Sequence, residues 1–146
     1  MCIIVDACCG HFMKLGNANA KPIHQWITNR NGRIATGGKN LRELIRCGLG
    51  TLLVEYRKAG KLCEFAEVRI EAQRKQIDES KIRSNDAHVI LLARVSGSRL
   101  VYTNDNLLKN DLRNSSLVPK RNNNSVQFYR GSVDRSKLYN CPSCHG

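Results

Sequence analysis

The stretch that decides the fold is residues 84–105, Ser-Asn-Asp-Ala-His-Val-Ile-Leu-Leu-Ala-Arg-Val-Ser-Gly-Ser-Arg-Leu-Val-Tyr-Thr-Asn-Asp. Asn85 is a good helix N-cap and places Asp86 in the first turn. Residues 87–95 are almost wholly apolar, which predicts a helix that is buried on most sides. After a Ser-Gly-Ser turn, residues 100–103 predict a strand. A buried helix that leads directly into a strand is typical of an α/β domain.

The flanking sequence extends the same alternation of strands and helices. Residues 2–5 predict a buried strand, residues 33–36 a short strand, and residues 126–129 an edge strand. Residues 64–70 fit either a strand or a helix. Further helical segments are predicted at residues 8–15, 23–28, 40–47, 52–56, 71–80 and 106–111. This alternation predicts an α/β domain with a mainly parallel sheet.

Length and charge narrow the class of protein. The chain has 146 residues, which suits one globular domain, and a formal net charge of +12. A domain this basic attracts polyanions, most commonly nucleic acid, although solubility alone also explains the charge. A membrane surface is a weaker candidate, because no segment combines a basic face with a clear apolar one. No apolar run approaches the ~20 residues of a membrane helix, and no signal peptide is evident. We therefore expect a cytoplasmic protein without a membrane partner.

Two of the best candidate strands lead into an aspartate. Asp6 follows residues 2–5, and Asp105 follows residues 100–103. Because the carboxyl ends of parallel strands meet at one edge of a sheet, we expect these side chains to lie together with Asp86. Clustered carboxylates repel one another unless a divalent cation neutralises them, and hard oxygen ligands suit Mg²⁺ or Mn²⁺. The pattern predicts a metal site that activates water to attack a phosphate.

In their order and spacing, four motifs resemble the PIN-domain nucleases. That family opens with a hydrophobic strand that ends in Asp, here Cys-Ile-Ile-Val-Asp6, and carries a Glu on an early helix, here Glu43. It then has an Asp that opens an apolar helix, here Asp86, and a strand into Thr-x-Asp, here Thr-Asn-Asp105. The resemblance covers residues 1–113.

This resemblance implies a three-layer α/β/α sandwich and a Mg²⁺- or Mn²⁺-dependent endoribonuclease. The implied catalytic and metal-binding residues are Asp6, Glu43, Asp86 and Asp105, with Glu55 as a weaker rival for Glu43. The implied outer-shell residues are Thr103, Asn104 and Asp111, although a plain surface charge is the simpler account of Asp111. Basic residues beside these motifs are candidates for RNA contact, and each also fits a solvated surface: Lys39, Arg42, Lys109 and Arg113.

Residues 114–146 form a basic extension beyond the core at residues 1–113, and they end in Cys-Pro-Ser-Cys-His-Gly. The Cys-x-x-Cys-His pattern marks haem attachment in some proteins, but here no secretory signal accompanies it. Half of a Zn²⁺ site is a better candidate, with Cys141, Cys144 and His145 as ligands, and a frayed end with free thiols is the alternative. All seven cysteines are expected to be thiols or metal ligands, and Cys2 and Cys8 are among those interpreted as small apolar residues.

The expected function is an endoribonuclease acting on RNA, of a size and charge that suit the toxin of a toxin–antitoxin or defence system. An antitoxin or another protein is a candidate partner, and the resemblance also implies a candidate homodimer. One alternative is a catalytically silent PIN-like module that binds nucleic acid or protein. Another is a structure-specific DNA nuclease with the same acidic site. His24 and His88 are interpreted as packing or surface residues.

Overall fold

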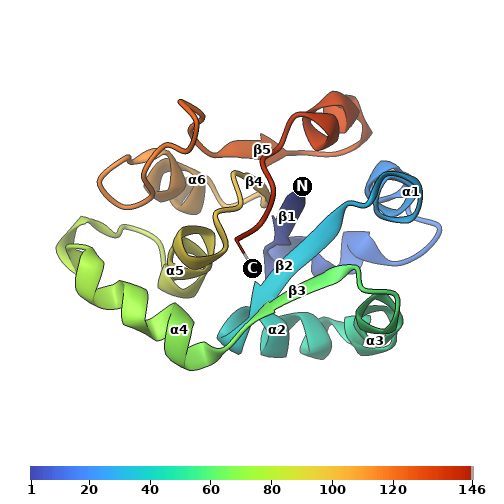
Figure 1. The fold of residues 1–146 in the computed structure, drawn as a ribbon, viewed down its shortest axis with the longest axis horizontal. Helices are drawn as coiled ribbons and strands as arrows, with labels where there is room; N and C mark the ends of the chain where they lie inside the picture. The colour runs from blue at the N-terminus through green and yellow to red at the C-terminus, as the bar shows by residue number, and fades with distance from the viewer. Residues whose placement is uncertain (146) are drawn as a thin grey trace.

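The computed structural model describes residues 1–145 and contains a five-stranded, all-parallel sheet with the order β3-β2-β1-β4-β5 (Figure 1). The strands are β1 (Cys2–Val5), β2 (Arg33–Gly37), β3 (Leu62–Phe65), β4 (Leu100–Tyr102) and β5 (Gln127–Tyr129). The predicted α/β fold with a mainly parallel sheet is confirmed.

The first strand is central because all four of its residues are apolar and buried. It pairs with β2 on one side and β4 on the other. The chain runs outward from β1 through β2 to β3, then returns to β4 and continues to β5. The winding therefore reverses between β1 and β4. In parallel α/β sheets, ligands bind beyond the carboxyl ends of the strands at such a switch point.

Helices cover both faces of this sheet (Figure 1). The α-helices are α1 (Lys21–Arg30), α2 (Gly38–Leu44), α3 (Gly50–Lys58), α4 (Glu67–Ala72), α5 (Ala87–Ser96) and α6 (Asn106–Arg113). The shorter elements are 3-10 helices η1 (Ala7–Met13), η3 (Gln73–Gln76), η4 (Glu79–Lys81) and η5 (Ser132–Tyr139), and a π-helix η2 (Ile45–Leu49). Within residues 1–145, no helix is long and apolar enough to cross a membrane.

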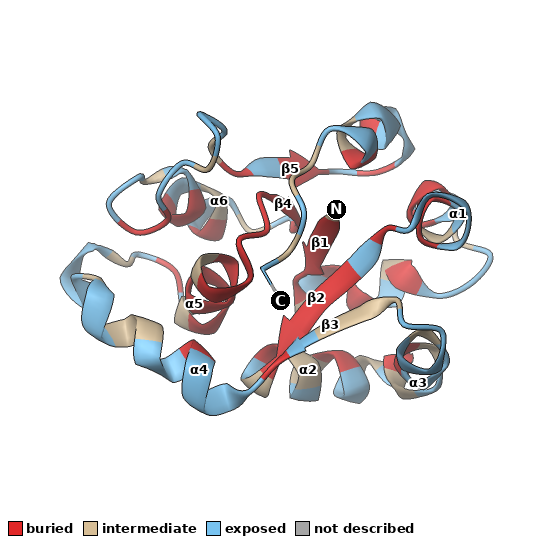
Figure 2. Ribbon diagram, viewed as in Figure 1, coloured by how far each residue is buried: buried red, intermediate tan, exposed pale blue. Residues whose placement is uncertain are grey.

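Two clusters of buried apolar side chains form the core, and the sheet contributes residues to both (Figure 2). One cluster is built on α5, which is buried along most of its length because nearly every residue from Val89 to Val95 is apolar. The other is built on α1 and includes Trp26 at its centre. Covering both faces explains why β1 is a continuous apolar run rather than an alternating one.

Several predicted boundaries differ from the observed ones. Residue Asp86, rather than Asn85, occupies the N-cap of α5, and Gly97 ends that helix in the left-handed region at φ 71°. The ambiguous segment 64–70 divides between the end of β3 and α4, and the helix predicted over residues 8–15 is the 3-10 helix η1 over Ala7–Met13. The predicted edge strand is confirmed as β5.

The extension after residue 113 packs as part of the same sheet. It supplies β5, and Leu117, Val118 and Val126 are buried against α5 and α6 in the first core cluster. Leu138, from the unpredicted helix η5, is fully buried in the second cluster. Residues 114–145 therefore complete both sides of the core.

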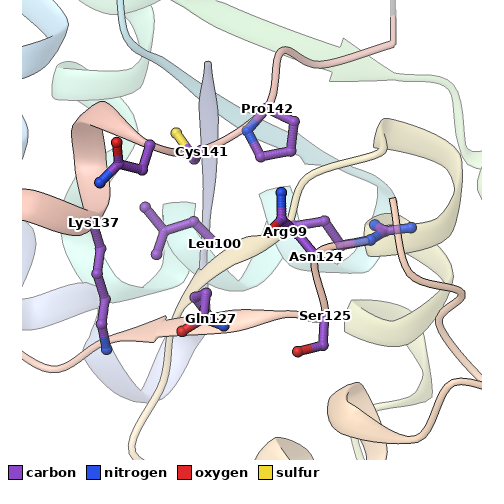
Figure 3. A pocket seen from close by; sticks show the side chains of 9 residues that line it. Arg99, Leu100, Asn124, Ser125, Gln127, Lys137, Cys141 and Pro142 are labelled. Atoms are coloured by element: carbon purple, nitrogen blue, oxygen red, sulfur yellow. The ribbon is translucent and has the colours of Figure 1, made fainter. Parts of the chain in front are cut away.

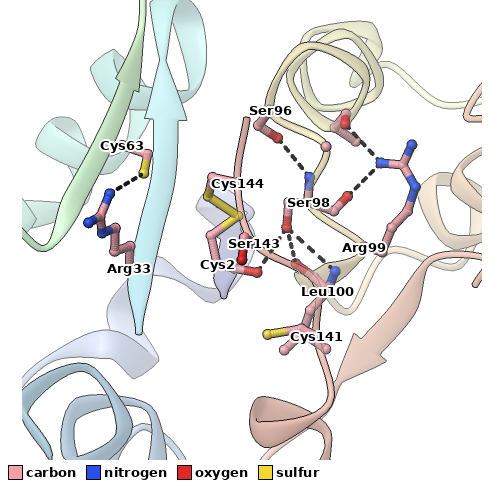
Figure 4. Close-up of a disulfide and its surroundings, with 12 residues drawn as sticks. Cys2, Arg33, Cys63, Ser96, Ser98, Arg99, Leu100, Cys141, Ser143 and Cys144 are labelled. Atoms are coloured by element: carbon pink, nitrogen blue, oxygen red, sulfur yellow. Dashed lines mark hydrogen bonds between the residues drawn. A yellow bond between two sulfur atoms is a disulfide. The ribbon is translucent and has the colours of Figure 1, made fainter. Parts of the chain in front are cut away.

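The prediction that all cysteines are thiols or metal ligands is wrong for Cys2 and Cys144, which form a disulfide (Figure 4). The tail folds back across the start of β1, and the two Cα atoms lie 5.6 Å apart, within the range that a disulfide spans. The tail is also held by a hydrogen bond from the His145 amide to the Ser96 carbonyl, at 2.7 Å.

The sulfurs of two of the three candidate zinc ligands already have partners within the protein. Cys144 is bonded to Cys2 (Figure 4). The Cys141 thiol donates to the Leu138 carbonyl at 3.2 Å. The tail lies at the amino end of β1, about 13 Å along an extended strand from Asp6. Its cysteines thus belong to a different part of the molecule from the carboxylates.

Candidate active site

The site begins with Asp6, which directly follows β1 and is only 4% exposed. Its Oδ2 accepts a hydrogen bond from the Thr103 hydroxyl at 2.8 Å and lies 3.2 Å from the Cys8 sulfur. Burial raises the pKa of Asp6 to about 6, and the Thr103 hydrogen bond opposes that rise. The negative charge of Asp6 is therefore only partly compensated by its protein partners.

Thr103 links the ends of the two central strands. Its hydroxyl donates to Asp6 and also accepts from the Asp105 amide, at 3.1 Å. Asp105 in turn caps α6, since its Oδ1 accepts from the amides of Leu107 and Leu108 at 2.9 and 3.2 Å. One carboxylate oxygen of Asp105 is thus committed to the helix end, which fixes the orientation of the other.

Asp86 approaches the same point from the start of α5. Its side chain makes no capping hydrogen bond to the helix that follows. Burial raises the pKa of Asp86 to about 6, and the next contributions come from the charge of Asp6 and from a hydrogen bond to Asp105. The charge of Glu43 adds a smaller contribution in the same direction. The structure therefore brings the other three predicted carboxylates, Asp6, Glu43 and Asp105, within electrostatic reach of Asp86.

Glu43 lies on α2. Its carboxylate is flanked by Lys39 from the same helix and by His88 from α5. The Nζ of Lys39 is 3.9 Å from Oε1, and the Nε2 of His88 is 3.2 Å from Oε2. His88 is 8% exposed, and its Nε2 is buried without an aligned hydrogen-bond partner. Burial lowers the pKa of His88, which favours the neutral ring. The interpretation of His88 as a packing or surface residue missed its position beside Glu43.

Two further polar residues position α2 against the sheet. Asn40 is 1% exposed, donates from Nδ2 to the Val5 carbonyl at 2.9 Å, and accepts from the Thr36 hydroxyl at 2.6 Å. These bonds fasten the first turn of α2 to the end of β1, one residue before Asp6. Polar residues at a predicted strand end and helix start were the available signal, but sequence reasoning assigned neither a role.

Asp111 is buried rather than a surface charge. It is 3% exposed, and its carboxylate accepts hydrogen bonds from the amides of Arg83 and Ser84 at 2.9 to 3.2 Å. Those amides belong to the loop that leads into Asp86. Asp111, on α6, therefore fixes the loop through which the chain reaches Asp86.

We expect Asp111→Ala to lower the free energy of unfolding by about 2 to 3 kcal/mol, because two amides near the protein interior lose their acceptor. Urea denaturation followed by circular dichroism measures this change. Asp78→Ala is the matched control, because exposed Asp78 likewise accepts a backbone amide, from Ser80, in a short surface turn. Equal losses in the two variants would contradict a special role for Asp111.

The remaining candidate residues have different surroundings. Asn104 is exposed beside Thr103. Arg42 forms a two-point ion pair with Glu67, with both contacts at 3.0 Å, and this pair occupies its guanidinium. The charges of Lys109 and Arg113 instead lie over the Phe128 ring, 5.9 and 4.8 Å from its centroid.

Cys8 corrects another sequence interpretation. It is exposed rather than a small apolar core residue, and its sulfur lies 3.2 Å from Asp6 Oδ2 and 3.7 Å from the Cys9 sulfur. Cys9, by contrast, is fully buried. Both residues lie at the start of η1, where Cys9 packs into the second core cluster and Cys8 stays exposed, so the apolar setting predicted from sequence holds for only one of them.

The donor chemistry of this acidic group suits a hard divalent cation. Asp6 Oδ1 and Asp105 Oδ2 accept none of the hydroxyl and amide hydrogen bonds described above, and the charges of Asp6, Asp105 and Glu43 oppose ionisation of Asp86. In residues 1–145, no three His, Cys, Asp or Glu side chains already stand at ligating distance of one point. Rotation of Asp86 and Glu43 side chains is therefore part of any metal binding here.

Comparison with known proteins adds no family. No protein-family model matches the chain, and searches of curated proteins and of solved structures return no match either. The fold is consequently described by its topology, and the likeness to PIN-domain nucleases rests on the four sequence motifs.

Proposed function

We propose that the protein is a PIN-like, divalent-metal-dependent endoribonuclease with Asp6, Glu43, Asp86 and Asp105 as its acidic group. The observation that carries the proposal is geometric: Asp6 and Asp105 follow the adjacent parallel strands β1 and β4, and the Thr103 hydroxyl links the Asp6 carboxylate to the Asp105 amide. A set of acids that repel one another at the switch point of a parallel sheet is a candidate cation site. The net charge of +12 supports a polyanionic substrate.

The residues around the acids supply orientation. Thr103 sets the relative position of Asp6 and the start of α6, while Asn40 holds the helix that carries Glu43. His88 limits where the Glu43 carboxylate moves. A bound Mg²⁺ or Mn²⁺ would lower the pKa of a coordinated water and neutralise charge on the attacked phosphate. The metal would thus supply the nucleophilic water, and hydrolysis would form one P–O bond and break another, with a proton passing from the water to the leaving ribose oxygen.

The decisive experiment incubates the purified protein with labelled single-stranded RNA in EDTA, Mg²⁺ or Mn²⁺, alongside single-stranded and flapped DNA. Cleavage of RNA that requires the metal supports the proposal. Cleavage of DNA alone would favour a structure-specific DNA nuclease. Binding of RNA without cleavage under every metal condition would contradict the endoribonuclease and favour a silent binding module.

A further inference from the structure

A basic groove lies between α6 and the edge strand β5. Its cavity has a volume of about 330 Å³, and four cationic side chains line it: Lys109, Arg113, Arg130 and Lys137. The polar side chains of Ser125 and Gln127 complete one wall. We call this set of residues the α6–β5 groove.

The groove continues into a second cavity of about 250 Å³ at the start of β4. Figure 3 shows Lys137, Gln127 and Ser125, which line both cavities, together with Arg99 and Leu100. Among residues 1–145, no acidic residue lines either cavity. The two hollows share Lys137 and run along β5, and the positive charge is concentrated in the first, because Arg99 is 6% exposed and its guanidinium donates to backbone carbonyls.

Internal contacts hold these cations in place. Asp134, which is 4% exposed, lies 2.8 Å from Arg130 and 3.3 Å from Lys137. The Lys137 ammonium also donates to the Phe128 carbonyl, at 2.8 Å. One buried carboxylate thus fixes two cations, and the four lining cations keep an excess of positive charge. Fixed cations lose less conformational entropy when they bind an anion.

The groove is connected to the acidic group through α6. Asp105 caps that helix, Lys109 lies about 6 Å further along its axis, and Arg113 lies about 12 Å along it. A row of positive charge therefore runs from the acidic residues toward β5. On the other side of the site, Arg42 is occupied by Glu67, as described above.

We propose that the α6–β5 groove binds the phosphodiester backbone of single-stranded RNA as it leaves the acidic group. This inference rests on the proposed function, since it assigns a path to that substrate. The lining favours a nucleic acid over an acidic protein because Phe128 and Val126 are only 4% and 2% exposed. Protein interfaces usually need accessible aromatic or aliphatic anchors, whereas phosphates need cations.

The test measures binding of a fluorescein-labelled single-stranded RNA by anisotropy, in EDTA and over a range of KCl concentrations. We expect Lys109→Glu/Arg113→Glu to weaken binding by about tenfold and to reduce the salt slope by about 1.4, for two lost phosphate contacts. Lys109→Met/Arg113→Met keeps the apolar stems over Phe128 and should reduce the slope by a similar amount.

The control is Lys58→Glu/Lys61→Glu, at the opposite edge of the sheet beside β3. It makes the same change in net charge. Equal weakening of RNA binding in the two double-Glu variants would therefore contradict the proposal that the groove binds RNA. If the wild type cleaves RNA with metal but the groove variants bind RNA as the control does, the proposed function is retained and the α6–β5 groove is rejected as the path of the RNA. Selective loss of binding without any wild-type cleavage would support the groove and reject the nuclease.

Discussion

Asp86→Asn is expected to lower the rate of Mn²⁺-dependent RNA cleavage by about a thousandfold, equivalent to about 4 kcal/mol of transition-state stabilisation. The substitution keeps the size of the side chain and removes the charge that a divalent cation requires. The N-cap geometry of α5 should persist, since the Asp86 carboxylate makes no capping hydrogen bond. Cleavage rates measured by denaturing gel electrophoresis at saturating Mn²⁺ give the ratio directly.

Glu55→Gln is the matched control for this experiment. Glu55 was the weaker sequence rival of Glu43, and it lies exposed on α3, where it lines a hollow with Leu52 and Tyr56. Its replacement should leave cleavage unchanged, because Glu55 faces the hollow between α1 and α3 and follows neither β1 nor β4. Full activity in Asp86→Asn, or equal losses in both variants, would reject the proposed acidic site.

The sequence predicted the positions of those site residues that are fixed by their immediate neighbours in the chain. Asp6 follows a run of four apolar residues, so its strand and its place at the strand end are local properties. Asp86 and Asp105 flank a helix–turn–strand unit whose apolar pattern leaves few alternatives. The parallel order of β1 and β4 then brings the ends of those segments together.

The residues that were missed depend on contacts across long stretches of chain. Asp111 accepts from amides 27 and 28 residues earlier, and a helical pattern gives no indication of that partner. The packing of α5 against α2 decides that His88 meets Glu43. The disulfide between Cys2 and Cys144 closes nearly the whole chain, with a separation of 142 residues. Periodicity describes which face of an element is buried, but not which element covers it.

The same limit applies to the basic residues. Sequence proximity to Asp105 selected Lys109 and Arg113, but it gave no reason to join them with Arg130 and Lys137. Formation of β5 beside β4 creates that groove, and Asp134 then orders two of its cations. A count of charges along the chain therefore predicts attraction for polyanions without predicting where they bind.

Without metal, Asp6→Asn and Asp86→Asn are each expected to raise the free energy of unfolding at pH 8 by about 1 to 2 kcal/mol. The folded-state pKa of both acids is about 6, above the ordinary value of 3.8. A shift of this size corresponds to an upper bound of about 3 kcal/mol, which solvent screening of the partly exposed Asp86 reduces. Urea denaturation in EDTA measures the difference.

The direction of the pH dependence follows from the same values. The folded protein holds protons on these acids more tightly than the unfolded chain, so their stabilising effect is complete below pH 3.8 and is lost as the pH rises through 6. The gain from each Asn variant should therefore shrink between pH 8 and pH 4. A gain that is equal at both pH values would show that removal of charge is not its cause.

Metal binding should make the wild type more stable than the two Asn variants, which reverses the order expected in EDTA. If the acids bind Mn²⁺ only in the folded protein, adding Mn²⁺ at pH 8 raises the stability of the wild type more than that of either Asn variant. Asp6 contributes to the raised pKa of Asp86, so the double variant in EDTA should gain less than the sum of the two single gains. The repulsion between the Asp6 and Asp86 charges would then explain both the lower stability of the metal-free protein and its affinity for a cation.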